Sequence, residues 1–382
     1  MSKKKELVFV AMSGGVDSSV AALLLHRKGY DVLGVFMRCY NLDGCAERDA
    51  EDARRVAEHI GIPFYVWDFE EEYKRRVVEY MVEGYRAGLT PNPDIACNRE
   101  IKFGLFLDRA LRMGADYVAT GHYVKLVTSD KKQVTRKKSV SRVPCPMSLF
   151  VASDENKDQS YFLWTLMQKD LAHCLFPVGG YKKSEIRAMA RKAGLPTAEK
   201  KDSQGICFLG KVTLDEFLRE YISAKEGDIV APDCRVLGKH EGAHFYTVGQ
   251  RHGVFVGDKR HATRDTRETK PHYVAAKDIT TNTLLVVEGS DHPALYKKEV
   301  VLTDVNFVNS DFLKTCPGSH DPCRLSVFAR VRYRQPLVKA SIINQGSKLK
   351  LVFEAPVKFV APGQSAVFYS KNREMLGGGV IE

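Results

Sequence analysis

Hydrophobic residues in the first third of the chain alternate between short continuous runs and helical spacing. The runs are short enough to be buried strands, and they lie at residues 7–12, 32–37, 64–69 and 117–120. Between them, apolar residues recur on one helical face, first at Val16, Val20, Leu23 and Leu24, then at Ala50, Ala53, Ala57 and Ile60. This repetition predicts an α/β fold with a doubly wound parallel sheet.

The rest of the chain follows two other patterns. Residues 157–225 keep helical spacing, and Gly194 with Pro196 stops one of these helices. From about residue 228, β-branched and aromatic runs separated by turn residues predict an all-β domain, a small barrel, with strands at residues 245–248, 273–276, 284–287, 325–333, 351–353 and 366–369. We therefore expect a doubly wound domain at residues 1–173 plus about 200–215, a central helical linking domain at about 174–227, and a C-terminal β-barrel at 228–382.

Composition points to a polyanionic partner and a reducing compartment. The formal net charge is +11 and the pI is about 9.1, which favours nucleic acid. The nine cysteines include no C-x-x-C pair, so we expect free thiols rather than disulfides or a zinc ribbon. The apolar run at 7–12 is too short for a signal peptide or a membrane span, which predicts a cytoplasmic protein without membrane contact. The basic segment 127–144 is either a solvated loop or an RNA contact.

The first candidate for chemistry follows the first strand. Residues 13–19 read Ser-Gly-Gly-Val-Asp-Ser-Ser and open the first helix. Glycines allow close backbone approach, and a helix N-terminus presents unpaired N–H groups, so this segment predicts a phosphate cradle. It has neither the lysine of a Walker A loop nor the dinucleotide glycine pattern. A glycine turn capped by Ser13 is the structural alternative.

Two cysteines stand in distinctive contexts. Residues 90–103 read Thr-Pro-Asn-Pro-Asp-Ile-Ala-Cys-Asn-Arg-Glu-Ile-Lys-Phe, with Asp94 three residues before Cys97. We expect a helix to start near Asn98, which would favour the Cys97 thiolate; a buried structural cysteine is the alternative. Cys207 lies between Gly205 and Gly210, far away in sequence, but partners in chemistry need only be neighbours in the fold.

One strand of the β domain carries arginines at alternate positions. In residues 324–334, alternation places Leu325, Val327, Val331 and Tyr333 on one face and Arg330, Arg332 and Arg334 on the other. Such a basic stripe suits a phosphate backbone, and a solvated sheet face is the alternative.

These motifs resemble two nested families. Ser-Gly-Gly-x-Asp-Ser after a first parallel strand resembles the loop of the N-type ATP pyrophosphatases, whose fold is adenine nucleotide alpha hydrolase-like. These enzymes cleave ATP between its α- and β-phosphates and adenylate a carbonyl oxygen. Residues 90–103 resemble the signature of the tRNA-specific 2-thiouridylases almost residue for residue. Further matches at 34–37, 119–123, 157–162 and 244–251 extend the resemblance over essentially the whole chain.

The resemblance implies a role for each matching residue. Cys207 would carry a persulfide, Cys97 would be the partner nucleophile, and Asp94 the acid–base residue. The implied ATP contacts are Ala11, Met12, Ser13, Gly14, Gly15, Val16, Asp17, Ser18, Met37 and Gly121, with Asp17 a candidate Mg²⁺ ligand. The implied tRNA contacts are Asn92, Pro93, Asp94, His122, Lys157, Asp158, Gln159, Arg332, Tyr333 and Gln364.

The implied activity is ATP-dependent 2-thiolation of the wobble uridine in tRNA. The enzyme would adenylate the 2-oxygen, insert persulfide sulfur, and release AMP and pyrophosphate. Its sulfur would come from an upstream sulfur-relay protein or a cysteine desulfurase. Alternatives are an iron–sulfur cluster on Asp94, Cys97 and Cys207, another carbonyl-adenylating synthetase, and a non-catalytic RNA-binding protein. Residues 38–40 depart from the family pattern, and Cys39 and Cys45 add thiols near the expected ATP site.

Overall fold

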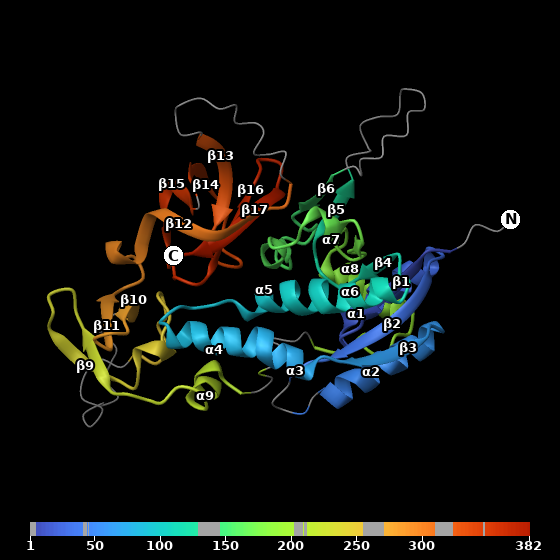
Figure 1. The fold of residues 1–382 in the computed structure, drawn as a ribbon, viewed down its shortest axis with the longest axis horizontal. Coiled ribbons are helices and arrows are strands. Elements are labelled where there is room, and N and C mark those ends of the chain that lie inside the picture. The colour runs from blue at the N-terminus through green and yellow to red at the C-terminus, as the bar shows by residue number, and fades with distance from the viewer. Residues whose placement is uncertain are drawn as a thin grey trace.

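The computed structural model describes most of the chain and arranges it around three β structures. The described residues are 5–40, 44, 46–128, 146–201, 209, 212–254, 271–309, 324–346 and 348–382. Figure 1 shows a parallel sheet near the N-terminus, a small sheet at the far end of α4, and a barrel at the C-terminus. None of the helices in the described part of the chain is long and apolar enough to cross a membrane.

The first sheet confirms the doubly wound prediction. Five parallel strands run in the order β3 (Phe64–Asp68), β2 (Asp31–Arg38), β1 (Leu7–Ala11), β4 (Tyr117–Ala119), β7 (Cys174–Leu175). Four of these strands match the predicted runs to within one residue at each end. Val8 and Val10 pack with one group of helices, whereas Phe9 and Ala11 pack with another, so helices cover both faces.

Helices divide between these two faces. One face holds α1 (Val16–Arg27), α2 (Ala46–Ile60) and α8 (Lys183–Lys192). The other holds a longer series: α3 (Glu70–Tyr73), the π-helix η1 (Lys74–Val78), α4 (Glu79–Arg86), α5 (Pro93–Cys97), the π-helix η2 (Asn98–Phe106) and α6 (Leu107–Arg112). The segment expected as a linking domain thus contributes β7 and α8 to the first sheet and its cover, followed by α9 (Leu214–Arg219). The domain boundaries stay predictions.

The second half of the chain forms two β structures rather than one continuous sheet. The smaller has the order β10 (His272–Asp278), β11 (Thr283–Glu288), β8 (Gly227–Val230), β9 (Val236–His240). The larger is a six-stranded barrel, closed by pairing of its first and last strands: β12 (Tyr296–Phe307), β15 (Lys348–Lys358), β14 (Val338–Gln345), β13 (Arg324–Arg330), β16 (Ser365–Tyr369) and β17 (Glu374–Ile381). Closure confirms the predicted barrel and removes its free edges.

A hairpin from the first half attaches to the barrel. β5 (Lys125–Thr128) pairs with β6 (Met147–Phe150), and β6 pairs with β17. Short helices η4 (Ser160–Leu163) and α7 (Gln168–Leu171) follow β6, while η5 (Ala243–Phe245) and η7 (Pro293–Leu295) lie among the later strands. Most of the basic segment 127–144 lies outside the described residues.

Two expectations for the β region were wrong. Residues 245–248 are not a strand: η5 ends at Phe245, and Gly249 has a φ of +85°, which breaks an extended strand. The basic stripe also does not form. Arg330 is buried at the junction between the barrel and the first half of the chain. Its Nη2 lies 2.6 Å from Asp158 Oδ2. Arg332 is partly buried and only Arg334 is exposed.

The buried Arg330–Asp158 pair should stabilise the junction strongly. Asp158→Ala leaves Arg330 buried without its partner, which costs about 3–5 kcal/mol of unfolding free energy. Asp291→Ala is the matched control, because it breaks an exposed pair with Lys358 and should change stability little. Urea unfolding followed by tryptophan fluorescence measures both, and equal losses would contradict a special role for the buried pair.

Candidate functional site

The loop between β1 and α1 is built to bring backbone N–H groups to an anion. Gly14 has a φ of +71°, and a Cβ there would lie 2.3 Å from the Asp49 carbonyl oxygen, so only glycine fits. Ser18 Oγ accepts the Ser13 N–H at 3.1 Å and donates to the Gly15 carbonyl at 3.1 Å. No side chain among the described residues caps Gly15, which leaves the first turn of α1 able to bind phosphate.

The other expected ATP contacts lie around this loop. A Cβ on Gly121 would be 2.7 Å from the Ser18 backbone nitrogen, so the turn after β4 touches the start of α1. Met37 lies near the end of β2 and is partly buried. The side chains of Ala11, Met12 and Val16 are buried in the cores, so these residues could offer a nucleotide only backbone groups.

Asp17, the candidate Mg²⁺ ligand, already has partners within the protein. Both of its carboxylate oxygens lie 2.7 Å from Lys183 Nζ, and Tyr123 donates its hydroxyl to Oδ1 at 2.7 Å. A metal ion there would have to replace an ammonium group. Among the residues that the structure describes, no three His, Cys, Asp or Glu side chains gather as metal ligands.

A second ion-pair cluster supports the loop from beneath. Lys200 Nζ lies 2.7 Å from Asp49 Oδ1 and 2.6 Å from Asp52 Oδ2, and the Asp49 carbonyl is the group that faces Gly14. Cys207 follows shortly after Lys200 but lies outside the described residues. Beyond it, Leu209 is buried in the same hydrophobic cluster as Cys97.

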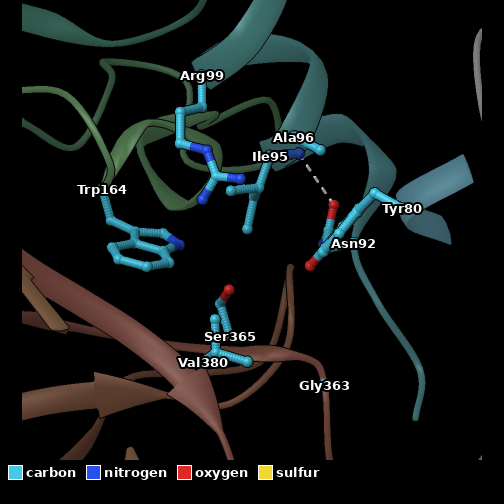
Figure 2. Close-up of a pocket in the computed structure, with 9 residues that line it drawn as sticks. All are labelled: Tyr80, Asn92, Ile95, Ala96, Arg99, Trp164, Gly363, Ser365 and Val380. Carbon is cyan, nitrogen blue, oxygen red and sulfur yellow. Dashed lines mark hydrogen bonds between the residues drawn. The ribbon is translucent and has the colours of Figure 1, made fainter. Parts of the chain in front are cut away.

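Cys97 lies elsewhere in its helix than expected. Asn92 Oδ1 accepts the N–H groups of Asp94 and Ile95 at 3.1 and 3.2 Å, and Pro93 occupies the first helical position. The helix therefore starts at Pro93, and buried Cys97 stands at the end of α5 instead of at a helix N-terminus. The expectation of a helix start near Asn98 was wrong, and the N-terminal argument for its thiolate falls with it. Figure 2 shows the start of α5 with its hydrogen bond to Asn92.

Asp94 and His122 share the influence of Lys102. Burial raises the pKa of Asp94, and the positive charge of Lys102 acts in the opposite direction. Burial also lowers the pKa of His122 well below 6.5, and Lys102 lowers it further. His122 is therefore neutral at physiological pH, with its Nδ1 2.7 Å from the Thr120 hydroxyl. The structure thus brings these two predicted tRNA contacts to one lysine.

The segment before Asp94 is held by the barrel and the small β structure. The Thr90 N–H donates to the Pro362 carbonyl at 2.8 Å, and Gln364 Nε2 donates to the Thr90 carbonyl at 2.8 Å. The Thr90 and Thr247 hydroxyl oxygens are 3.3 Å apart. Gln364, an expected tRNA contact, therefore fixes the loop that leads to Asp94.

The remaining expected tRNA contacts also have partners within the protein. Asp158 pairs with Arg330, and Gln159 Oε1 accepts the Tyr123 N–H at 3.0 Å. Arg332 donates to the Val248 carbonyl at 2.6 Å, and the Tyr333 ring lies 4.5 Å from that of Phe162. Lys157 is partly exposed and Pro93 is buried. Binding of tRNA by these residues stays a prediction.

The other described cysteines differ in their access to solvent. Cys174 is buried in β7, where burial raises the pKa of its thiol, and its Sγ donates to the Asp170 carbonyl at 3.0 Å. Cys234 is exposed in the turn between β8 and β9, and Cys39 is partly buried after β2. Cys174 is therefore a core residue, whereas Cys234 is an accessible thiol away from the nucleotide loop.

Sequence reasoning missed Lys102 and Lys183. Lys183 reaches Asp17 across 166 positions, and no spacing rule connects two such residues. Lys102 lies within the segment 90–103, four residues after the predicted helix start. Its influence on His122 depends on the fold, and the sequence does not show it. A lysine at the first position of a helix that follows a parallel strand was the available signal for Lys183.

Known sequence families cover nearly the whole chain. Residues 6–211 match the family described as tRNA methyl transferase HUP domain. Residues 215–288 match the tRNA methyl transferase PRC-barrel domain, and residues 297–381 match the aminomethyltransferase beta-barrel domain. The second and third matches coincide with the small sheet and the closed barrel.

Curated relatives are similar from end to end. The tRNA-specific 2-thiouridylase MnmA of Enterococcus faecalis is 43% identical and aligns over 99% of this chain and 96% of its own. The proteins of the same name from Alkaliphilus oremlandii and Bacillus subtilis are 42% and 41% identical, covering 100% of this chain and 99% and 97% of theirs. This chain belongs to the tRNA-specific 2-thiouridylase family. The predicted family resemblance is thereby confirmed, and this family member keeps all three β structures.

In this 2-thiouridylase family member, the loop between β1 and α1 should lose affinity for ATP when Gly14 acquires a side chain. Gly14→Ala places a Cβ against the Asp49 carbonyl, so the affinity for ATP should fall by at least about tenfold, about 1.4 kcal/mol. Gly29→Ala is the matched control, since Gly29 also has a positive φ but no described atom within 4 Å of the added Cβ. Calorimetric titration with ATP tests both, and an unchanged affinity for Gly14→Ala would contradict the assignment.

Proposed function

We propose that this chain replaces the 2-oxygen of the wobble uridine in tRNA with sulfur, at the expense of ATP. The observation that carries the proposal is its 43% identity, over 99% of the chain, to a tRNA-specific 2-thiouridylase. The glycine loop at the carboxyl end of β1 supports a nucleotide site, because ligands of doubly wound sheets bind at that edge. Mg²⁺ would enter with the ATP phosphates as part of the substrate.

Adenylation solves the difficulty of removing an oxygen from the base. The 2-oxygen of uridine is amide-like and leaves poorly, whereas an adenylated oxygen leaves as AMP. The loop at Gly14 and Gly15 would bind the pyrophosphate end of ATP. Lys183 would place a positive charge beside that loop while Asp17 and Tyr123 hold it in position.

The sulfur step uses two cysteines. The terminal sulfur of a Cys207 persulfide attacks C2 of the adenylated uridine, and AMP leaves. The Cys97 thiolate then attacks the Cys207 sulfur, which forms a Cys97–Cys207 disulfide and leaves the transferred sulfur on C2. In the alternative order, Cys97 attacks the persulfide first and frees sulfide, which attacks C2. Either order oxidises two thiols, so an external thiol must reduce the disulfide before the next cycle.

Asp94 is proposed as the acid–base residue beside Cys97. Its raised pKa lets it hold a proton more readily than an ordinary aspartate, as a general acid requires. Asp94 and Cys97 are three residues apart in one helical turn, which places their side chains on neighbouring positions of the same face. A sulfur-relay protein or a cysteine desulfurase would load Cys207.

The nucleotide products test the adenylation step. With unmodified tRNA and a sulfide source, ATP should be converted to AMP and pyrophosphate, because the loop binds pyrophosphate and the reaction needs an adenylate. Chromatography of the nucleotides measures this. ADP and orthophosphate as the main products would exclude the mechanism.

Serine variants test the sulfur step. Cys97→Ser and Cys207→Ser should each abolish persulfide-dependent thiolation while tRNA binding persists, since each removes one sulfur of the expected disulfide. Cys234→Ser is the control, because it removes an exposed thiol outside the proposed chemistry and should leave the rate unchanged. Non-reducing peptide mapping after one turnover detects the Cys97–Cys207 disulfide. Iron bound by anaerobically purified protein would instead favour the cluster alternative.

Methyl transfer is the second candidate, because two of the matching families carry that name. Mass spectrometry of the tRNA nucleosides separates the two reactions, since one exchanges oxygen for sulfur and the other adds a methyl group. A methylated nucleoside that requires a methyl donor and no ATP would replace the thiolation proposal.

A further inference from the structure

A small pocket lies where α5 and η2 meet the C-terminal barrel (Figure 2). Its enclosed part measures about 10 Å³, which admits one oxygen-sized group, and the remainder opens toward solvent. Five of its lining side chains can donate hydrogen bonds: Tyr80, Asn92, Arg99, Trp164 and Ser365. The pocket therefore offers several donors to a hydrogen-bond acceptor that extends outward.

Trp164 contributes a buried donor that lacks a protein acceptor. Its side chain is 2% exposed, and Nε1 has no hydrogen-bond partner among the residues that the structure describes. The ring is fixed in place: a Cβ on Gly378 would lie 2.7 Å from its Cγ. Figure 2 shows the indole nitrogen on the side of the ring that faces Ile95 and Asn92. A buried N–H in this position calls for an acceptor from a ligand.

An arginine that shares a carboxylate with a second arginine also lines the pocket. Arg99 Nε lies 2.8 Å from Glu100 Oε1, and Arg76 Nη1 lies 3.3 Å from the other oxygen of the same carboxylate. The Glu100 carboxylate is thus shared by two arginines, and Figure 2 shows the terminal nitrogens of Arg99 over the pocket. Burial raises the pKa of Tyr80, Arg99 acts in the opposite direction and the negative charge of Asp304 raises it further, so the phenol keeps its proton as a donor.

We propose that this pocket binds one phosphate of the RNA backbone, a phosphodiester that flanks the uridine reaching Asp94 and Cys97. One non-bridging oxygen would enter the enclosed part and accept the Trp164 N–H, while Arg99 balances the charge from the open side. Asn92 places the pocket two residues from Asp94, and its amide nitrogen is a donor because the helix cap uses the oxygen. This inference rests on the proposed function and adds a substrate contact to it.

A pair of matched arginine variants tests the charge contact. Arg99→Gln and Arg76→Gln each remove one positive charge from the same carboxylate, but only Arg99 lines the pocket. Affinity for tRNA is measured against salt. The slope of log affinity against log salt should decrease in magnitude by about 0.7–0.9 for Arg99→Gln and stay unchanged for Arg76→Gln. Equal slopes for the two variants would overturn the proposal.

A neutralised RNA backbone locates the phosphate itself. Anticodon stem-loop RNAs that carry one methylphosphonate linkage each are titrated against the wild-type chain, Arg99→Gln, Trp164→Phe and Arg76→Gln. One linkage should weaken binding by about tenfold in the wild type and in Arg76→Gln, and its effect should be clearly smaller in each of the two pocket variants, since each has lost one of the two contacts to the phosphate. If no linkage behaves in this way, the pocket holds water and the proposal is wrong.

The same titrations separate the two levels of inference. Wild-type chain that does not bind tRNA at any salt concentration would contradict the proposed function as well. Wild-type chain that binds and thiolates tRNA while the pocket variants match Arg76→Gln would contradict only the phosphate contact. Trp164→Phe keeps the aromatic packing against Gly378 and removes only the N–H, and exposed Arg99 gives a second variant that does not disturb the core.

Discussion

The geometry of the candidate site depends on how Thr90 is held. Its N–H binds the barrel at Pro362, its carbonyl accepts Gln364, and its hydroxyl meets Thr247 next to the small sheet. The cap that starts α5 follows two residues later, so the barrel and the small β structure both determine where Asp94 lies. Backbone hydrogen bonds of this kind are costly to leave unmade in a buried junction. The barrel therefore positions the loop that leads to Asp94.

This arrangement gives several expected tRNA contacts a second task. Gln364 donates to the Thr90 carbonyl, and Arg332 donates to the Val248 carbonyl. Gln159 accepts the N–H of Tyr123, whose hydroxyl donates to Asp17 in the first turn of α1. A substrate that engages these side chains must compete with bonds inside the protein or use their remaining donors. If tRNA binds these side chains, substrate binding and domain contacts are energetically linked, since both use the same polar groups.

Local patterns predicted the first sheet well and the junctions poorly. Buried parallel strands and a glycine turn depend on residues that are adjacent in the sequence, which is why four strands and the turn at Gly14 could be predicted. The alternation of apolar and polar residues around Arg330 does not show whether its side chain faces solvent or another part of the protein, because its partner Asp158 lies 172 positions away. The start of α5 was readable: asparagine followed by proline is a strong helix start, and it outweighed the later Asn98. The pairing of Lys183 with Asp17 required the fold.

The charges around Asp94 suggest how substrate would prepare its own chemistry. Burial already raises the pKa of Asp94, neutral His122 adds no charge, and the positive charge of Lys102 opposes the shift. A phosphate in the pocket beside Asn92 would bring a negative charge close to this carboxyl group, and tRNA would bury it further. Both effects disfavour the carboxylate and so act in the direction of protonation. On the proposed function, binding of the RNA would favour the protonated form of Asp94. Asp94 would then act as a general acid mainly when tRNA is bound.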